Sequence, residues 1–187
     1  MSSGHKRSRP PHVTTRPARR LASFIAAVAI GAGAIGSVAA APARRLRLPA
    51  ELVLRDGQQG FVGESGSVVT IDREGRFRVA RFVNDRIQPP HFHGLLRAEA
   101  IRELARAWAR VNPADLPGVM SRSAAANPHR LQMSVGKRTS TLTLLPGETA
   151  QEAAAALRRG GPNPATRFLE LWITAQKAVA REGRKKR

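Results

Sequence analysis

Apolar and polar residues alternate along several short segments of the chain, as they do in strands that bury one face. Residues 51–55, 67–71 and 76–82 show this alternation. The last two segments are separated by residues 72–75, with the sequence Asp-Arg-Glu-Gly, where the glycine favours a reversing turn. The pattern predicts one strand followed by a hairpin. It also predicts a turn over residues 56–60, which are polar and contain two glycines.

A second hairpin is predicted further along the chain. Residues 130–135 alternate, and residues 139–145 alternate again after a Gly-Lys pair that favours a turn. The return segment is rich in threonine, which suits the surface of a sheet. Residues 114–128 show no period and are predicted to form a loop.

Three segments have the spacing of helices. Apolar residues at i, i+3, i+4 and i+7 predict a helix over residues 96–111, which Pro113 ends because the residue before a proline avoids helical geometry. Thr149 can cap a short alanine-rich helix that ends near Gly160. The last helix is predicted over residues 165–181, with basic residues in its final turn.

The order of these elements is three strands, a helix, two strands and two helices. Because the strands follow one another as hairpins, we expect an α+β fold: an antiparallel sheet built from hairpins, with two to three helices packed on one face. No glycine-rich loop joins a strand to a helix in the way that dinucleotide-binding folds require.

The N-terminal segment has the order of a bacterial export signal. Residues 1–20 hold six Lys and Arg and no acid, residues 21–35 are apolar, and small residues follow. We expect residues 1–40 to be a signal peptide that is cut before Ala41, with the Sec and twin-arginine routes both open. The protein would then be exported to the periplasm, the cell envelope or the medium. A leader that is not cut would anchor it to the membrane.

The remaining chain is expected to comprise a linker over residues 41–50, a single domain over residues 51–181 and a basic tail over residues 182–187. Removing the 40 leader residues from 187 leaves 147. Of the 32 basic residues 26 remain, against 13 acids, a net charge of +13. The absence of cysteine excludes disulfides and thiolate metal sites.

That charge favours anionic partners, such as an anionic polymer or lipid of the envelope. The alternative is that arginines are scattered along the chain for solubility. Nucleic acid is not expected, because tyrosine is absent and aromatic residues are scarce, while single-stranded nucleic acid is bound on exposed aromatic faces.

Catalytic chemistry has little support in the sequence. His91 and His93 could reach one metal ion from an extended segment, but a zinc site needs three or four ligands and nothing places Glu99 or His129 beside them. We therefore expect no metal and no cofactor, with Phe92 anchoring a loop and the two histidines bonded locally or solvated. No serine lies in a Gly-x-Ser-x-Gly motif. The protein is expected not to be an enzyme.

A flexible apolar loop is the candidate binding segment. Gly60, Phe61, Val62 and Gly63 place two apolar side chains between glycines. Such a loop either tucks into the core or presents a contact to a partner.

The sequence also resembles the emfourin-like domain, a family of small bacterial proteins that inhibit thermolysin-type metallopeptidases. The matching pieces are residues 52–56, Gly60-Phe61-Val62-Gly63, residues 68–72 and 97–111, Asp115-Leu116-Pro117, and residues 131–145 and 168–172. The leader, a Pro/His insertion over residues 86–94 and an alanine-rich segment over residues 147–161 depart from the pattern.

This resemblance implies an inhibitor that binds a secreted or envelope peptidase, with Phe61 and its neighbours as the contact. We therefore expect an exported, non-enzymatic protein-binding domain. The alternative is an envelope protein that binds an anionic polymer or lipid through its basic surface.

Overall fold

Within the described residues, eight strands form one sheet in the order β4-β3-β2-β1-β7-β8-β6, and β5 also pairs with β3. The computed structural model describes residues 46–61, 63–124 and 126–183. The expected leader and residues 184–187 of the tail lie outside this part. The strands are β1 (Leu52–Gly60), β2 (Gly63–Ile71), β3 (Arg76–Val83), β4 (Arg86–Ile87), β5 (Phe92–Leu95), β6 (Val119–Ser121), β7 (His129–Val135) and β8 (Arg138–Leu144). The helices are α1 (Ala98–Val111), the 3-10 turn η1 (Pro113–Asp115), α2 (Ala150–Arg158) and α3 (Pro164–Gly183).

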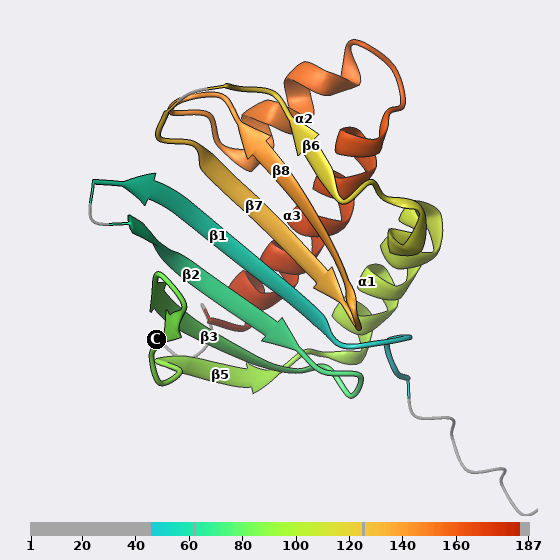
Figure 1. Cartoon of the computed structure of the whole chain (residues 1–187). Coiled ribbons are helices and arrows are strands. Elements are labelled where there is room, and N and C mark those ends of the chain that lie inside the picture. Colours follow the sequence, from blue (N-terminus) through green and yellow to red (C-terminus); the bar gives the residue numbers. More distant parts are fainter. Residues whose placement is uncertain (1–45, 62, 125, 184–187) are drawn as a thin grey trace, which may run out of the picture. The chain divides into compact units, whose positions relative to one another are not determined.

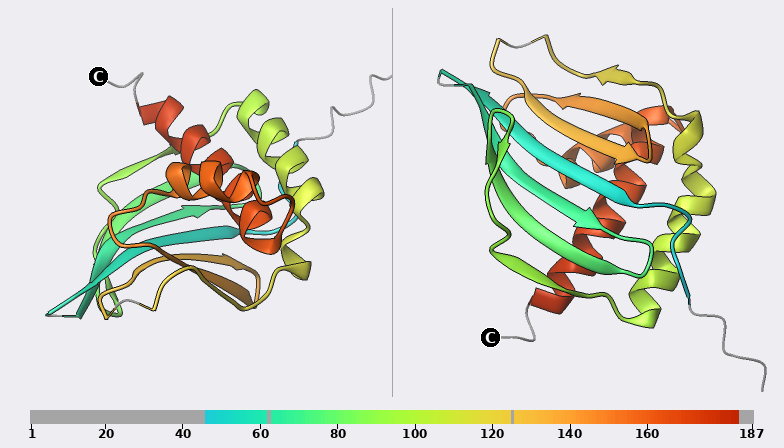
Figure 2. Two further views of the ribbon diagram at one scale, coloured as in Figure 1. Left: turned by 90° about the horizontal axis from the view of Figure 1, so that it is seen from above. Right: turned by 60° about the horizontal axis from the view of Figure 1, so that its bottom comes forward.

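The α-helices cover one face of the sheet and leave the other face open (Figure 1, Figure 2). All strand pairs are antiparallel except β6 and β8, which are parallel. The predicted α+β fold, with a sheet built from hairpins and helices on one face, is confirmed. In the part of the chain that is described, no helix is long and apolar enough to cross a bilayer.

The first predicted hairpin is confirmed at its turn. The Asp72 carboxylate accepts the backbone N–H groups of Glu74 at 3.0 Å and Arg76 at 2.8 Å. Gly75 has a φ of +83°, a conformation that favours glycine. These hydrogen bonds satisfy backbone N–H groups at the turn that have no partner on a neighbouring strand. They also help to fix the register of β2 with β3.

The turn predicted over residues 56–60 is wrong, because β1 runs through it to Gly60 and pairs with β2 along its whole length. Gly57 lies opposite Gly66 in that pair. A Cβ on Gly57 would come within 2.6 Å of the Glu64 carboxylate and 2.9 Å of the Phe82 ring, and one on Gly66 would collide with the Asp56 carbonyl. The glycines therefore permit a close approach within the sheet rather than a reversal.

Two segments predicted to be loops contain edge strands. Within residues 114–128, β6 adds a parallel strand beside β8. β5 (Phe92–Leu95) pairs with β3, and the centre of the Phe92 ring lies 5.3 Å from that of Phe77. Phe92 therefore anchors its segment as expected, but through a strand and not a loop.

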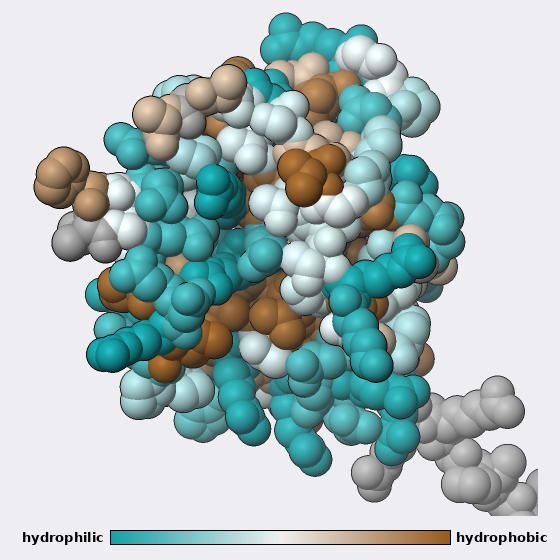
Figure 3. Space-filling view, viewed as in Figure 1, coloured by the Kyte–Doolittle hydropathy of each residue, from teal (hydrophilic) through white to brown (hydrophobic). Residues whose placement is uncertain are grey.

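The open face of the sheet combines a small apolar cluster with polar side chains. Val68, Ala80 and Phe82 are buried on it, with Val53 packed against them. Figure 3 shows hydrophobic side chains gathered over β2 and β3, with strongly hydrophilic side chains around them. The open face is therefore polar at its margins and apolar near β2 and β3.

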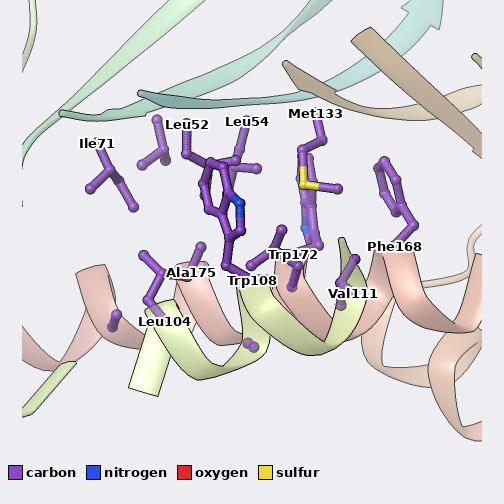
Figure 4. Close-up of a cluster of buried hydrophobic side chains, with 14 of the residues drawn as sticks. Leu52, Leu54, Ile71, Leu104, Trp108, Val111, Met133, Phe168, Trp172 and Ala175 are labelled. Carbon is purple, nitrogen blue, oxygen red and sulfur yellow. The ribbon is translucent and has the colours of Figure 1, made fainter. Parts of the chain in front are cut away.

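The main core lies between the other face of the sheet and helices α1 and α3 (Figure 4). Its large buried side chains include Leu52, Leu54, Ile71, Leu104, Trp108, Met133, Phe168 and Trp172. Leu48, in the segment expected to be a linker, is also buried, and its N–H donates to the Arg73 carbonyl at 2.8 Å. All core residues fall between Leu48 and Val179, within one compact unit, Pro42–Arg187. The chain after the leader thus holds a complete core of its own.

The predicted helices are confirmed with small changes at their ends. α1 ends at Val111, and the residue that follows, Asn112, adopts a left-handed φ of 44°. Thr149 caps α2 as predicted: its hydroxyl accepts the Glu152 N–H at 3.3 Å, and the Glu152 carboxylate accepts the Thr149 N–H at 2.8 Å. This reciprocal pair satisfies two backbone donors at the start of the helix.

Candidate functional site

The tip of the β1–β2 hairpin presents Phe61 to solvent. Gly60 pairs with Gly63 across the tip, and the side chain of Phe61 is fully exposed, at 107% of its reference area. Phe61 therefore does not tuck into the core; Val62 lies outside the described residues. The hairpin extends past the helices that cover the rest of the sheet (Figure 2).

One side of this hairpin is braced by the turn between β3 and β4. Asn84 accepts the Glu64 N–H through its side-chain oxygen at 3.0 Å, and its own N–H donates to the Glu64 carbonyl at 2.6 Å. Gly63 has a φ of +112°, and a Cβ there would collide with the Asn84 side chain. At Gly63 the backbone therefore has a conformation that glycine adopts readily, and it lies directly against the side chain of Asn84.

Arg55 links the same elements on the open face. Its guanidinium lies 3.9 Å from the centre of the Phe82 ring, forms an ion pair with Glu64 at 3.1 Å and donates to the Asn84 carbonyl at 2.5 Å. A cation over an aromatic ring is attracted by the charge distribution of the ring. Three strands and a turn are thereby joined beneath the tip.

The other side of the hairpin is braced by the loop before β7. Gln58 donates from its side chain to the Asn127 carbonyl at 2.9 Å, and the Gln59 N–H donates to the Pro128 carbonyl at 3.1 Å. Both flanks of the hairpin are therefore fixed close to its end. Phe61 is carried on a rigid support and not on a loose loop.

A histidine–carboxylate pair lies on the helix side of the sheet, where β1 and β7 adjoin. His129 contacts the Asp56 carboxylate through Nε2 at 2.7 Å and the Glu148 carbonyl through Nδ1 at 3.3 Å. The hydrogen bond and charge of Asp56 raise the pKa of His129 against the opposing effect of burial, and the Glu148 carbonyl adds to the rise. With both nitrogens protonated, the ring donates to both partners. The pair acts as a link between β1, β7 and the segment before α2.

We expect this link to make stability depend on pH. Because the pKa of His129 is raised above its ordinary value of 6.5 in the folded state, its contribution is complete below that value and is lost as pH rises through the folded pKa. Urea unfolding followed by circular dichroism at about pH 5.5 and about pH 9 should show the decline. His129→Gln should flatten this part of the profile. An unchanged profile in that variant would show that other groups cause the decline.

The structure does not bring His91 and His93 into one site. His91 lines a hollow of about 700 Å³ with Asp56 and Arg81, on the helix side of β1 to β3. His93 lines a different hollow, with Arg78, on the open face. Among residues 46–61, 63–124 and 126–183, no group of three His, Asp or Glu side chains is arranged to hold a metal ion.

Two features of the site were missed by the sequence reasoning. Asp56 and His129 are 73 positions apart, and only the pairing of β1 with β7 brings them together. Asn84, which braces the tip, belongs to a turn between β3 and an edge strand that the alternation did not reveal. A left-handed φ of 54° at Asn84 is a conformation for which asparagine is favoured, but it is visible only in the structure.

Comparison of the chain with models of known protein families gives no match, and comparison with curated proteins finds none of significant similarity. The resemblance to the emfourin-like domain thus remains an expectation based on short motifs.

Proposed function

We propose that this protein is an exported, non-enzymatic domain that binds another protein through the tip of its β1–β2 hairpin. The observation that carries the proposal is the full exposure of Phe61 at the end of a hairpin whose two flanks are both hydrogen-bonded to neighbouring loops. Large aromatic side chains supply much of the binding energy at protein interfaces. A fully exposed phenylalanine on a fixed support is suited to enter an apolar pocket of a partner.

The bracing of the hairpin supports this role energetically. Binding through a flexible loop costs free energy because the loop must be ordered, whereas a segment already held in one conformation avoids part of that cost. The contacts of Asn84 and Gln58 hold the base of the tip before any partner arrives. Little of the binding free energy that Phe61 contributes would then be offset by the cost of ordering the hairpin.

The partner class that we propose is an exported metallopeptidase of the thermolysin type. This choice comes from the emfourin-like order of elements, in which the Gly-Phe loop corresponds to Gly60–Gly63. The export signal expected in residues 1–40 would bring the protein into the compartment where such peptidases act. An apolar pocket on the peptidase would receive the ring of Phe61.

Phe61→Ser tests the proposal directly. Binding and inhibition of a thermolysin-type peptidase by residues 41–187 should be detectable at micromolar concentration, and the variant should lose about 2 kcal/mol, or roughly 30-fold in Kd. Val119→Ser is the matched control, because Val119 is an exposed apolar residue on β6, an edge strand that β7 and β8 separate from β1.

The outcomes separate the two parts of the proposal. If wild-type protein neither binds nor inhibits, the peptidase is the wrong partner. If it binds and Phe61→Ser binds equally well, the hairpin tip is not the contact. If Val119→Ser weakens binding as much as Phe61→Ser, the effect is not specific to the tip.

A further inference from the structure

The open face of β3 and β5 carries a basic hollow that the proposed function does not use. Arg76 and Arg78 occupy successive positions on this face of β3, opposite Leu95 and His93 of β5. These four residues and Pro90 line a hollow of about 650 Å³. Two residues apart on a strand, the arginines are separated by roughly 7 Å. Their guanidinium groups can therefore reach separate anionic groups on one surface.

The charge of these arginines is not balanced within the described residues. Arg78 forms no ion pair there, and Arg76 only reaches Asp72 at 4.0 Å with an exposed side chain. On the helix side, by contrast, Arg110 and Arg181 are paired with Glu170 at 2.6 Å and Glu103 at 2.8 Å. The open face of β3 thus keeps a positive field available to an anionic partner.

Exposed apolar side chains lie on the strands that pair with the same edge of β3, Leu95 within the basic hollow and Ile87 further along β3. Leu95 and Ile87 are each 61% exposed, and both belong to short strands paired with β3. Leu95 lies opposite Arg76, and Ile87 lies opposite Phe82, on the same face. Figure 3 shows hydrophobic and strongly hydrophilic side chains side by side over this part of the sheet. Apolar and basic side chains together are typical of surfaces that lie at a membrane–water interface.

Helix α3 ends beside β5, on the helix side of the sheet. A Cβ on Gly183 would lie 3.4 Å from the ring of Phe92, so the helix ends against β5. The sequence continues with Arg184, Lys185, Lys186 and Arg187.

We infer that the open face of β3 and β5 is a docking surface for an anionic phospholipid bilayer. Arg76 and Arg78 contact the headgroup phosphates, and Leu95 and Ile87 enter the interface between headgroups and acyl chains. Basic residues near an anionic membrane are attracted to it over about one Debye length. A soluble anionic polymer would satisfy the arginines but would leave the two apolar side chains in water, so the bilayer fits this surface better.

Vesicle co-sedimentation of residues 41–187 tests the inference, because this part of the chain contains the complete core. Vesicles that contain phosphatidylglycerol should bind the protein, and vesicles of pure phosphatidylcholine should not. R76Q/R78Q should weaken binding by roughly 10-fold. The matched control is R158Q/R159Q, which removes the same charge from exposed residues at the end of α2 and should leave binding within about 2-fold of wild type.

A second pair of substitutions separates a bilayer from a soluble polyanion. L95S/I87S should weaken vesicle binding while leaving binding to soluble polyphosphate unchanged. The inference is overturned if L95S/I87S binds vesicles as wild type does. It is also overturned if R76Q/R78Q and R158Q/R159Q weaken binding equally, because binding would then depend only on the net charge of the protein. All substituted side chains are exposed, so thermal unfolding should be unchanged. Phe61→Ser should retain vesicle binding, which separates this test from that of the hairpin tip.

Discussion

Replacing Trp172 with alanine is expected to lower the free energy of unfolding by about 4 kcal/mol. Trp172 is only 1% exposed, and its ring stacks on that of Phe168 with 5.7 Å between centres. It lies between α3 and the sheet (Figure 4). The loss combines the transfer free energy of the indole with the cavity that remains, because a packed core relaxes only in part. It is large beside the roughly 5–15 kcal/mol of a whole domain.

Urea unfolding followed by circular dichroism measures this effect without relying on tryptophan fluorescence. Phe61→Ala serves as the control, because it also removes an aromatic ring but from a fully exposed position. We expect the control to change stability by less than about 0.5 kcal/mol. If Trp172→Ala cost no more than the control, α3 would not be packed against the sheet as the structure shows.

The sequence predicted those strands and helices in which the spacing of apolar residues marks one buried face. β7 alternates because Leu131 and Met133 are buried on the helix side while the residues between them are partly exposed. β3 alternates as well, but its buried residues change face: Phe77 is buried on the helix side, and Ala80 and Phe82 are buried on the open face. α1 shows the helical spacing for the same reason as β7, with Leu104 and Trp108 buried one turn apart. Where one face is apolar and the other polar, local pattern and tertiary packing agree.

The missed strands are short or lack such a contrast. β4 has two residues and β6 has three, which is too few for a period to be recognised. The far half of β1 was predicted to be a turn because glycine occurs in both turns and closely packed strands. Only the facing pair of Gly57 and Gly66 distinguishes the second case.

The candidate site divides in the same way. Phe61 was selected from sequence because an apolar residue on a glycine-flanked loop either enters the core or contacts a partner, and the sequence left both possibilities open. The structure shows it exposed because β1 and β2 pair as far as Gly60 and Gly63. Asp56 and His129 become neighbours only through the register of β1 with β7. Arg78 and Leu95 share a hollow only because β5, which was predicted as loop, pairs with β3. Contacts between strands distant in sequence leave no local period.

Removing the positive charge of Arg122 is expected to destabilise the protein by about 3 kcal/mol. Arg122 and Glu148 form an ion pair at 2.5 Å, with side chains only 16% and 10% exposed. Glu148 also accepts the Leu145 N–H at 3.1 Å, and its carbonyl faces His129. Arg122→Met would keep much of the apolar stem but leave a largely buried carboxylate without its cation. Urea unfolding at neutral pH would measure the loss.

A double-mutant cycle shows whether the loss comes from the pair itself. Glu148→Gln alone leaves Arg122 without its anion, so it should also be costly, whereas the double variant leaves neither charge uncompensated. The double variant should therefore be more stable than the sum of the single losses implies, with a coupling of roughly 1–3 kcal/mol. Additive losses would mean that Arg122 acts only through its packing. Because the Glu148 carbonyl also contacts His129 of β7, strong coupling would indicate that the segment before α2 is fixed by charge to the segment after β6 at a point where it already contacts β7.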